Sequence, residues 1–121
     1  MTYDILVLDL DGTLTNSEKK ITPPTREALI EIQQNGKKVV LASGRPTPGI
    51  IPLAKELCLG DYGSYILSFN GGKIINCSTG EAICNKRLPS EVTSTVYEIA
   101  NQYDVDLLTY TERSEERRVG K

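Results

Sequence analysis

The chain has 121 residues, of which 39% are hydrophobic and 25% charged, and its formal net charge is −2. This composition is ordinary for a soluble globular protein, and the slight negative charge excludes the basic face that nonspecific nucleic-acid binding needs. No apolar run approaches the roughly 18 residues of a membrane span, and the amino terminus lacks signal-peptide features, so we expect a cytoplasmic protein without a membrane or nucleic-acid partner.

The first predicted element is a strand over Tyr3–Leu8, whose continuous apolar residues are typical of a parallel sheet covered on both faces. It is followed by two carboxylates, Asp9 and Asp11, then by Gly12, which permits a sharp turn, and the hydroxyl of Thr13. Ligands of such sheets bind beyond the carboxyl ends of the strands. Buried acids there are costly unless a cation or several donors compensate them, which indicates a metal and phosphate site.

A polar stretch, Leu14–Ile21, is expected to form a small flap or hairpin beside this site. Proline is tolerated in the first turn of a helix, so the pair Pro23-Pro24 predicts a helix start, and Asn35-Gly36 predicts its end after Gln34. A second buried strand over Val39–Ala42 follows, and it runs into Ser43-Gly44-Arg45-Pro46.

The next predicted helix runs from about Thr47 to Leu57, and a third strand follows over Tyr65–Phe69 and ends at Asn70. The alternation of strands and helices predicts an α/β fold with a Rossmann-like parallel sheet built on these first three strands. The pattern then changes to a hairpin over Lys73–Lys86, centred on Ser78-Thr79-Gly80. A helix over Glu91–Gln102 and a strand over Val105–Tyr110 complete the predicted elements.

The chain contains no histidine, which removes Ser-His-Asp and Cys-His catalysis and histidine zinc ligation from its 121 residues. General acid–base chemistry would then depend on Asp or Glu, and hard oxygen ligands suit Mg²⁺. Three cysteines, Cys58, Cys77 and Cys84, have no CxxC spacing and are expected to be reduced thiols.

Polar residues follow each of the three predicted parallel strands. Asp9 and Asp11 follow the first, Ser43 and Arg45 the second, and Asn70 the third. Neighbouring strands lie about 5 Å apart, so these residues are expected to form one cleft at one edge of the sheet. Each group alone has an ordinary structural explanation as a turn, a cap or a surface charge. Their joint placement favours a functional site.

These segments resemble the haloacid dehalogenase-like (HAD) superfamily of phosphotransferases. Asp9-Leu10-Asp11-Gly12-Thr13-Leu14 is similar to its first motif, and Ala42-Ser43-Gly44-Arg45-Pro46 to its second, in the form of the Cof-type subgroup with a large cap. Asn70-Gly71-Gly72 resembles that subgroup's third strand end, where Asn-Gly-Ala is usual. The resemblance covers about residues 1–110.

The resemblance implies a role for each matching residue. Asp9 would be the nucleophile that forms an aspartyl-phosphate, and Asp11 the general acid that protonates the leaving oxygen. The metal site would hold Mg²⁺ with Asp9 and, through its backbone carbonyl, Asp11. Ser43 would donate a hydrogen bond to the phosphoryl oxygens, and Gly44 would permit close backbone approach.

The other residues of the resemblance carry open alternatives. Gly12 and Thr13 would contribute to phosphate binding, and Asn70 would orient groups at the mouth of the cleft. Arg45 is expected either to face the substrate or to form a structural ion pair. The substrate would be a small phosphorylated metabolite, with sugar phosphates favoured, while the oligomeric state is left undetermined.

Two motifs of the family have no counterpart in the sequence: a later lysine, and an acidic Gly-Asp-type strand end that completes the metal site. We therefore expect an amino-terminal fragment, with the HAD-like core in residues 1–87, the beginning of an α+β cap in residues 88–112, and weak or no activity of its own. Residues 113–121, with six charges, are expected to be a frayed end or a non-native tail, because they read like translated sequencing-adapter DNA.

Two hypotheses of function remain at this point. The first is a Mg²⁺-dependent phosphatase that acts through an aspartyl-phosphate. The alternative is a non-catalytic phosphate-binding or phospho-acceptor module that resembles a response-regulator receiver. The pair Asp9 and Asp11 followed by Gly12 disfavours the alternative, because receivers place their acceptor on a later strand.

Overall fold

A computed structural model describes residues 2–110 and 116–118. The chain divides into two compact units, Met1–Asn85 and Lys86–Lys121. The first unit contains the sheet, two helices and all of the residues that the sequence singles out. The second unit is small and is described by itself below.

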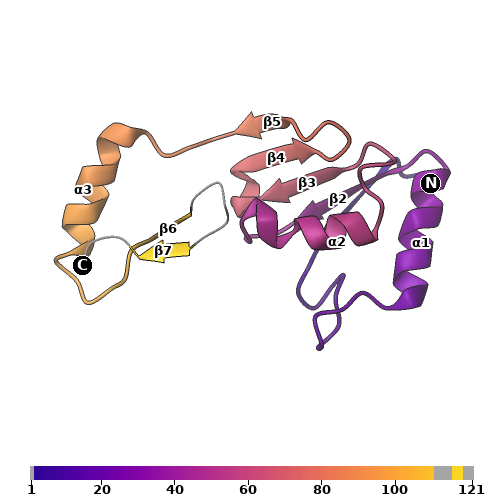
Figure 1. Cartoon of the computed structure of the whole chain (residues 1–121), viewed down its shortest axis with the longest axis horizontal. Helices are drawn as coiled ribbons and strands as arrows, with labels where there is room; N and C mark the ends of the chain where they lie inside the picture. Colours follow the sequence, from indigo (N-terminus) through magenta and orange to yellow (C-terminus); the bar gives the residue numbers. More distant parts are fainter. Residues whose placement is uncertain (1, 111–115, 119–121) are drawn as a thin grey trace. The chain divides into compact units, whose positions relative to one another are not determined.

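The first unit is built on a five-stranded mixed sheet in the order β1-β2-β3-β4-β5 (Figure 1). Its strands are β1 (Ile5–Asp9), β2 (Lys38–Ala42), β3 (Tyr65–Ser68), β4 (Lys73–Asn76) and β5 (Ala82–Asn85). The first three strands pair in parallel, and β4 and β5 add to β3 as antiparallel neighbours. This confirms the predicted α/β fold with a Rossmann-like sheet.

The parallel register brings the three strand ends to one edge of the sheet. Asp9 is the partner of Ala42 across β1 and β2, and Ala42 is the partner of Leu67 across β2 and β3. The residues that follow these positions therefore leave the sheet side by side, as the sequence predicts.

Two α-helices and two short 3₁₀ turns connect the strands: α1 (Pro23–Gln34), η1 (Thr47–Gly49), α2 (Ile51–Glu56) and η2 (Phe69–Gly71). The bounds of α1 agree with the prediction from Pro23-Pro24 and Asn35-Gly36. The single helix predicted from Thr47 to Leu57 is instead η1 followed by the shorter α2, and each of these two begins with a proline in its first turn.

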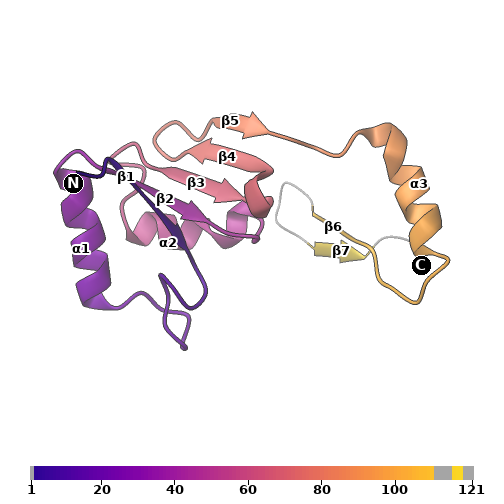
Figure 2. The same ribbon diagram turned by 180° about the vertical axis from the view of Figure 1, so that it is seen from behind.

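The hydrophobic core lies on one face of the sheet. Val39 and Leu41 of β2 are fully buried, whereas Val40 and Ala42, which point to the opposite face, are partly exposed. Figure 1 shows α2 in front of the strands, and the view from behind in Figure 2 shows the strands in front of α2. The prediction of a sheet covered on both faces is therefore wrong for the described residues.

The first strand is exposed, although its sequence predicts burial. Ile5 and Val7 are each 58% exposed and Leu6 is 40% exposed. Within the described part of the chain β1 pairs with β2 alone, so it forms an edge of the sheet. The sequence of a strand shows that its side chains are apolar, but the burial of those side chains depends on which other elements pack against the strand.

The second unit contains α3 (Ser90–Ala100), β6 (Leu108–Tyr110) and β7 (Glu116–Arg118), of which the two strands pair antiparallel. The predicted helix is confirmed, while the predicted strand from Val105 begins later. Of the predicted tail, residues 113–115 and 119–121 lie outside the described residues, and the origin of the tail stays a prediction. No helix in the described part of the chain is both long and apolar enough to cross a membrane.

Candidate active site

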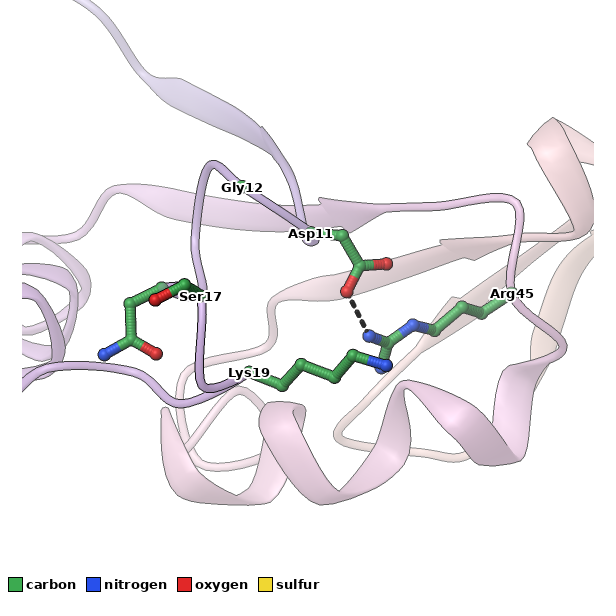
Figure 3. Close-up of a pocket in the computed structure, with 6 residues that line it drawn as sticks. Asp11, Gly12, Ser17, Lys19 and Arg45 are labelled. Atoms are coloured by element: carbon green, nitrogen blue, oxygen red, sulfur yellow. Dashed lines mark hydrogen bonds and ion pairs between the residues drawn. The ribbon is translucent and has the colours of Figure 1, made fainter.

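An open cleft of about 670 Å³ lies at the carboxyl edge of the parallel strands, in the first unit. Its walls come from the loop after β1 and from the loop after β2 (Figure 3). The lining residues are all polar, charged or glycine: Asp11, Gly12, Asn16, Ser17, Lys19 and Arg45. Such a lining suits a hydrated, charged ligand better than an apolar one.

Asp9 is the last residue of β1, and a tight turn directly after it places Asp11. Gly12 has φ of +80°, a left-handed conformation that favours glycine, and no atom lies within 4 Å of a β-carbon built on it. The amide of Thr13 donates to the carbonyl of Leu10 at 3.1 Å, and the amide of Leu14 donates to the carbonyl of Asp9 at 3.2 Å. Because the Leu10 side chain is fully buried, this turn is anchored to the core.

Asp11 and Arg45 form an ion pair across the cleft. A guanidinium nitrogen of Arg45, Nη2, lies 2.5 Å from Oδ1 of Asp11, and Nη1 donates to the carbonyl of Gly49 at 3.2 Å. The Arg45 side chain is 29% exposed, and the Asp11 side chain is 57% exposed. Arg45 thus forms the ion pair and also lines the cleft, so the structure contains elements of both alternatives that the sequence leaves open.

The loops after β2 and β3 are joined by main-chain hydrogen bonds. The amide of Asn70 donates to the carbonyl of Ser43 at 3.1 Å, and the amide of Phe69 donates to the carbonyl of Arg45 at 3.0 Å. The Ser43 hydroxyl oxygen accepts from the amide of Arg45 at 3.1 Å, which orients the hydroxyl and leaves its proton to donate elsewhere.

Three predicted site residues line the cleft, namely Asp11, Gly12 and Arg45. The others lie at or just beyond the strand ends but do not line it: Asp9, which is the last residue of β1, and Thr13, Ser43, Gly44 and Asn70. Sequence reasoning missed Asn16, Ser17 and Lys19, although it predicted that their segment lies beside the site. A sequence signal that could have pointed to Lys19 is Asn16, a residue typical of turns, three positions before the pair Lys19-Lys20.

The two acids are exposed, which corrects the expectation that the fold buries them. In the described residues, no group of three or more Asp, Glu, Cys or His side chains gathers in a way that could hold a metal. The donor set still fits Mg²⁺, because this cation binds through one or two carboxylates and completes its shell with water and substrate phosphate. The residues that would hold it are Asp9 and Asp11.

Comparison with known proteins identifies the family. The haloacid dehalogenase-like hydrolase family matches residues 6–115, which is most of the chain. The chain therefore belongs to the haloacid dehalogenase-like hydrolases.

Individual relatives agree with this assignment. The crystal structure of a haloacid dehalogenase-like hydrolase from Bacteroides thetaiotaomicron matches with a TM-score of 0.82 and 52% identity, over 90% of this chain and 41% of that one. "Putative phosphatase M6_Spy0533" of Streptococcus pyogenes is 37% identical over 83 residues, which are 69% of this chain and 31% of the relative. The 5-amino-6-(5-phospho-D-ribitylamino)uracil phosphatase YcsE of Bacillus subtilis is 27% identical over 107 residues, 88% of this chain and 41% of YcsE. The chain thus spans about a third of the length of the curated relatives that it matches.

Proposed function

We propose that this chain carries the nucleophile and the general acid of a Mg²⁺-dependent phosphatase that hydrolyses small phosphorylated metabolites in the cytoplasm. The observation that supports this proposal most strongly is the turn after β1. It presents two accessible carboxylates, Asp9 and Asp11, beside a polar cleft, in a chain of the haloacid dehalogenase-like family.

The proposed reaction has two displacement steps at phosphorus. A carboxylate oxygen of Asp9 attacks the phosphorus atom, the bond between phosphorus and the ester oxygen breaks, and Asp11 gives its proton to the departing oxygen. Water then attacks the aspartyl-phosphate, with Asp11 accepting the proton of that water. Asp9 is regenerated and inorganic phosphate leaves.

Neighbouring residues support these steps. The Ser43 hydroxyl has a proton to donate to the phosphoryl oxygens. Gly12 and Thr13 would contribute to phosphate binding, Thr13 through its side-chain hydroxyl because its amide donates to the Leu10 carbonyl. Asn70 and Gly44 hold the loop after β3 against the loop after β2. When bound, Mg²⁺ would offset the negative charge that otherwise repels the phosphate ester from Asp9.

The ion pair between Asp11 and Arg45 bears directly on the role of Asp11. Oδ1 of Asp11 is held by Nη2 of Arg45, so this oxygen is not free to reach the departing oxygen of a substrate. For Asp11 to act as an acid, the Arg45 contact has to open when the substrate binds. The substrate therefore has to offer Arg45 another negative partner.

We further propose that the chain is the amino-terminal part of a longer enzyme. The core would occupy residues 1–87, and a cap would begin in residues 88–112. The length of the relatives supports this, as does the apolar edge strand β1. Genomic DNA sequence beyond the codon of Glu112 tests it: we expect an open frame with a lysine and a Gly-Asp-type strand end. A genomic frame that encodes residues 113–121 and then a stop contradicts it.

Sugar phosphates are the substrates that we favour. Asn16 and Ser17 in the cleft can hydrogen-bond the hydroxyl groups of a sugar, and one relative is named for a phospho-ribityl substrate. A panel of phosphate monoesters tests this preference against other phosphorylated metabolites.

The decisive experiment replaces Asp9 with Asn in the whole protein. Asp9→Asn keeps the size of the side chain but removes the nucleophilic oxygen charge, so hydrolysis of phosphate monoesters should fall by at least about 10³. Asp4→Asn is the matched control, because Asp4 is 90% exposed and pairs with Lys37 away from the cleft. Hydrolysis by Asp9→Asn at the wild-type rate would contradict the proposal.

A further inference from the structure

The cleft lies on the side of the site from which the leaving group departs. Its lining includes Asp11, the residue that we propose protonates the leaving oxygen, and it includes neither Asp9 nor Ser43, which we propose contact the transferred phosphoryl group. Because Gly12, which we propose binds phosphate, also lines the cleft, the cleft begins beside the phosphoryl group and has room for the remainder of the substrate.

A hydrogen-bonded turn holds Lys19 at the wall of this cleft. The side-chain oxygen Oδ1 of Asn16 accepts from the amides of Glu18 at 3.0 Å and of Lys20 at 3.1 Å. The amide of Lys19 donates to the carbonyl of Asn16, and the amide of Asn16 donates to the carbonyl of Lys20, each at 2.9 Å. The turn therefore fixes the position from which the Lys19 side chain projects.

Lys19 adopts an unfavourable backbone conformation in this turn. Its φ is +60°, a left-handed conformation that costs a residue with a β-carbon about 1–2 kcal/mol relative to the right-handed region. Glycine or asparagine would fit this position better. A lysine here has a conformational cost that its place in the turn does not explain.

The charges of the cleft are unbalanced. Lys19 and Arg45 supply two positive groups, and Asp11 supplies one carboxylate. Figure 3 shows the Lys19 side chain extending from its loop toward the guanidinium of Arg45. Among the described residues, the Lys19 ammonium group has no ion pair or hydrogen bond. Two cations that face one cleft repel each other unless an anion lies between them.

We infer that Lys19 and Arg45 form a subsite for a second acidic group, carried by the leaving portion of the substrate. The inference rests on the proposed function and narrows its substrate class, among sugar phosphates, to those that carry a second acidic group: phosphate esters of sugar acids and other hydroxy acids, or bisphosphates. Asp11 can neutralise one of the two cations of the cleft, and Lys19 supplies the positive charge that is left for the second acidic group. Asn16 is the positioning residue, because its side chain holds the turn that carries Lys19.

This subsite also explains how Asp11 becomes free to act. An acidic group that binds between Lys19 and Arg45 competes with Asp11 for the guanidinium. When the Arg45 contact opens, Oδ1 of Asp11 is released to reach the departing oxygen. An ester without a second acidic group leaves the ion pair closed and is a poorer substrate.

The test uses the whole protein with Mg²⁺ and three esters on one carbon skeleton. Glycerol 3-phosphate has a neutral leaving portion, 3-phosphoglycerate adds a carboxylate, and glycerol 1,3-bisphosphate adds a second phosphate. We expect at least one acidic ester to have a kcat/KM about tenfold above that of glycerol 3-phosphate, mainly because its KM is lower. A tenfold ratio corresponds to about 1.4 kcal/mol of binding free energy. The better of the two acidic esters identifies the group that the subsite binds.

Variants assign the preference to Lys19. Lys19→Gln should lower kcat/KM for the acidic ester about tenfold more than for glycerol 3-phosphate, while Lys19→Arg should retain most of the advantage of the acidic ester. Lys20→Gln is the matched control, because Lys20 lies in the same turn but does not line the cleft. Higher ionic strength should shrink the advantage in the wild type and not in Lys19→Gln.

The same experiments distinguish a failure of the proposed subsite from a failure of the proposed phosphatase function. Equal turnover of all three esters by the wild type, or an equal loss for all three in Lys19→Gln, would overturn the subsite and leave the phosphatase standing. No hydrolysis of these or other monoesters by the whole protein would overturn the proposed function, and the subsite with it.

Discussion

Gly44 and Asn70 fit together so closely that a β-carbon at position 44 would lie 2.9 Å from Oδ1 of Asn70 and 3.3 Å from its Nδ2. Gly44 is thus required for close approach and not for an unusual backbone angle. The contact joins the loop after β2 to the loop after β3, and the amide of Asn70 reinforces it by donating to the carbonyl of Ser43. A substitution at one of these two positions therefore changes the packing of the other.

A double-mutant cycle measures this relationship. Gly44→Ala should lower the free energy of unfolding by about 1–2 kcal/mol, because the new methyl group displaces the Asn70 side chain. Asn70→Gly removes that side chain and suits the φ of +54° at this position. In the Asn70→Gly background the cost of Gly44→Ala should fall by at least about 0.5 kcal/mol in urea denaturation. Additive costs would show that the two residues do not interact.

Lys19 should separate stability from substrate preference. Lys19→Gly relieves the left-handed strain but adds flexibility to the unfolded chain, so the free energy of unfolding should stay unchanged or rise by up to about 1 kcal/mol. The same variant should lose the preference for the acidic ester. Thermal unfolding and the three-ester assay measure the two effects, and a marked loss of stability would mean that the lysine serves the fold.

Gln33 should be important for stability although it lies far from the cleft. It is 3% exposed, its amide nitrogen donates to the carbonyls of Leu57 and Leu29, and its oxygen accepts from the Ser64 hydroxyl at 2.8 Å. Gln33→Leu leaves these buried groups without partners and should cost about 2 kcal/mol in urea denaturation. The exposed neighbour Gln34 provides the control, because Gln34→Leu should change stability by less than about 0.5 kcal/mol.

Cys77 should make stability depend on alkaline pH. Burial raises the pKa of its thiol from 9.0 to about 11. The folded state therefore holds the proton more tightly than the unfolded state, so this contribution to stability is complete below pH 9 and is lost as the pH rises to about 11. Denaturation curves of the wild type and Cys77→Ala should diverge in this window, with Cys84→Ala as the control. Parallel pH profiles would contradict the raised pKa.

Local signals in the sequence were sufficient for the elements around the site. Pro23-Pro24 and Asn35-Gly36 mark the two ends of α1 correctly, because caps and breakers act on their own turn of helix. Strands β2 and β3 follow from short apolar runs, and their parallel pairing brings the predicted polar residues to one edge. The ends of these strands are therefore the part of the site that sequence predicts well.

The features that depend on distant parts of the chain could not be predicted in this way. The exposure of Ile5 and Val7 depends on which strands and helices surround β1, and no local pattern reports that. The contact between Asp11 and Arg45 joins residues 34 positions apart, so the sequence leaves it as one of two alternatives. Lys19 was missed because its direction depends on the hydrogen bonds that Asn16 makes around it.

The main-chain bonds that tie Ser43 to Asn70, and Arg45 to Phe69, hold the loops after β2 and β3 in register without using their side chains. A lineage can therefore exchange the side chains of these loops while the spacing between the loops persists. Such a framework separates changes at the edge of the cleft from the upkeep of the main-chain geometry.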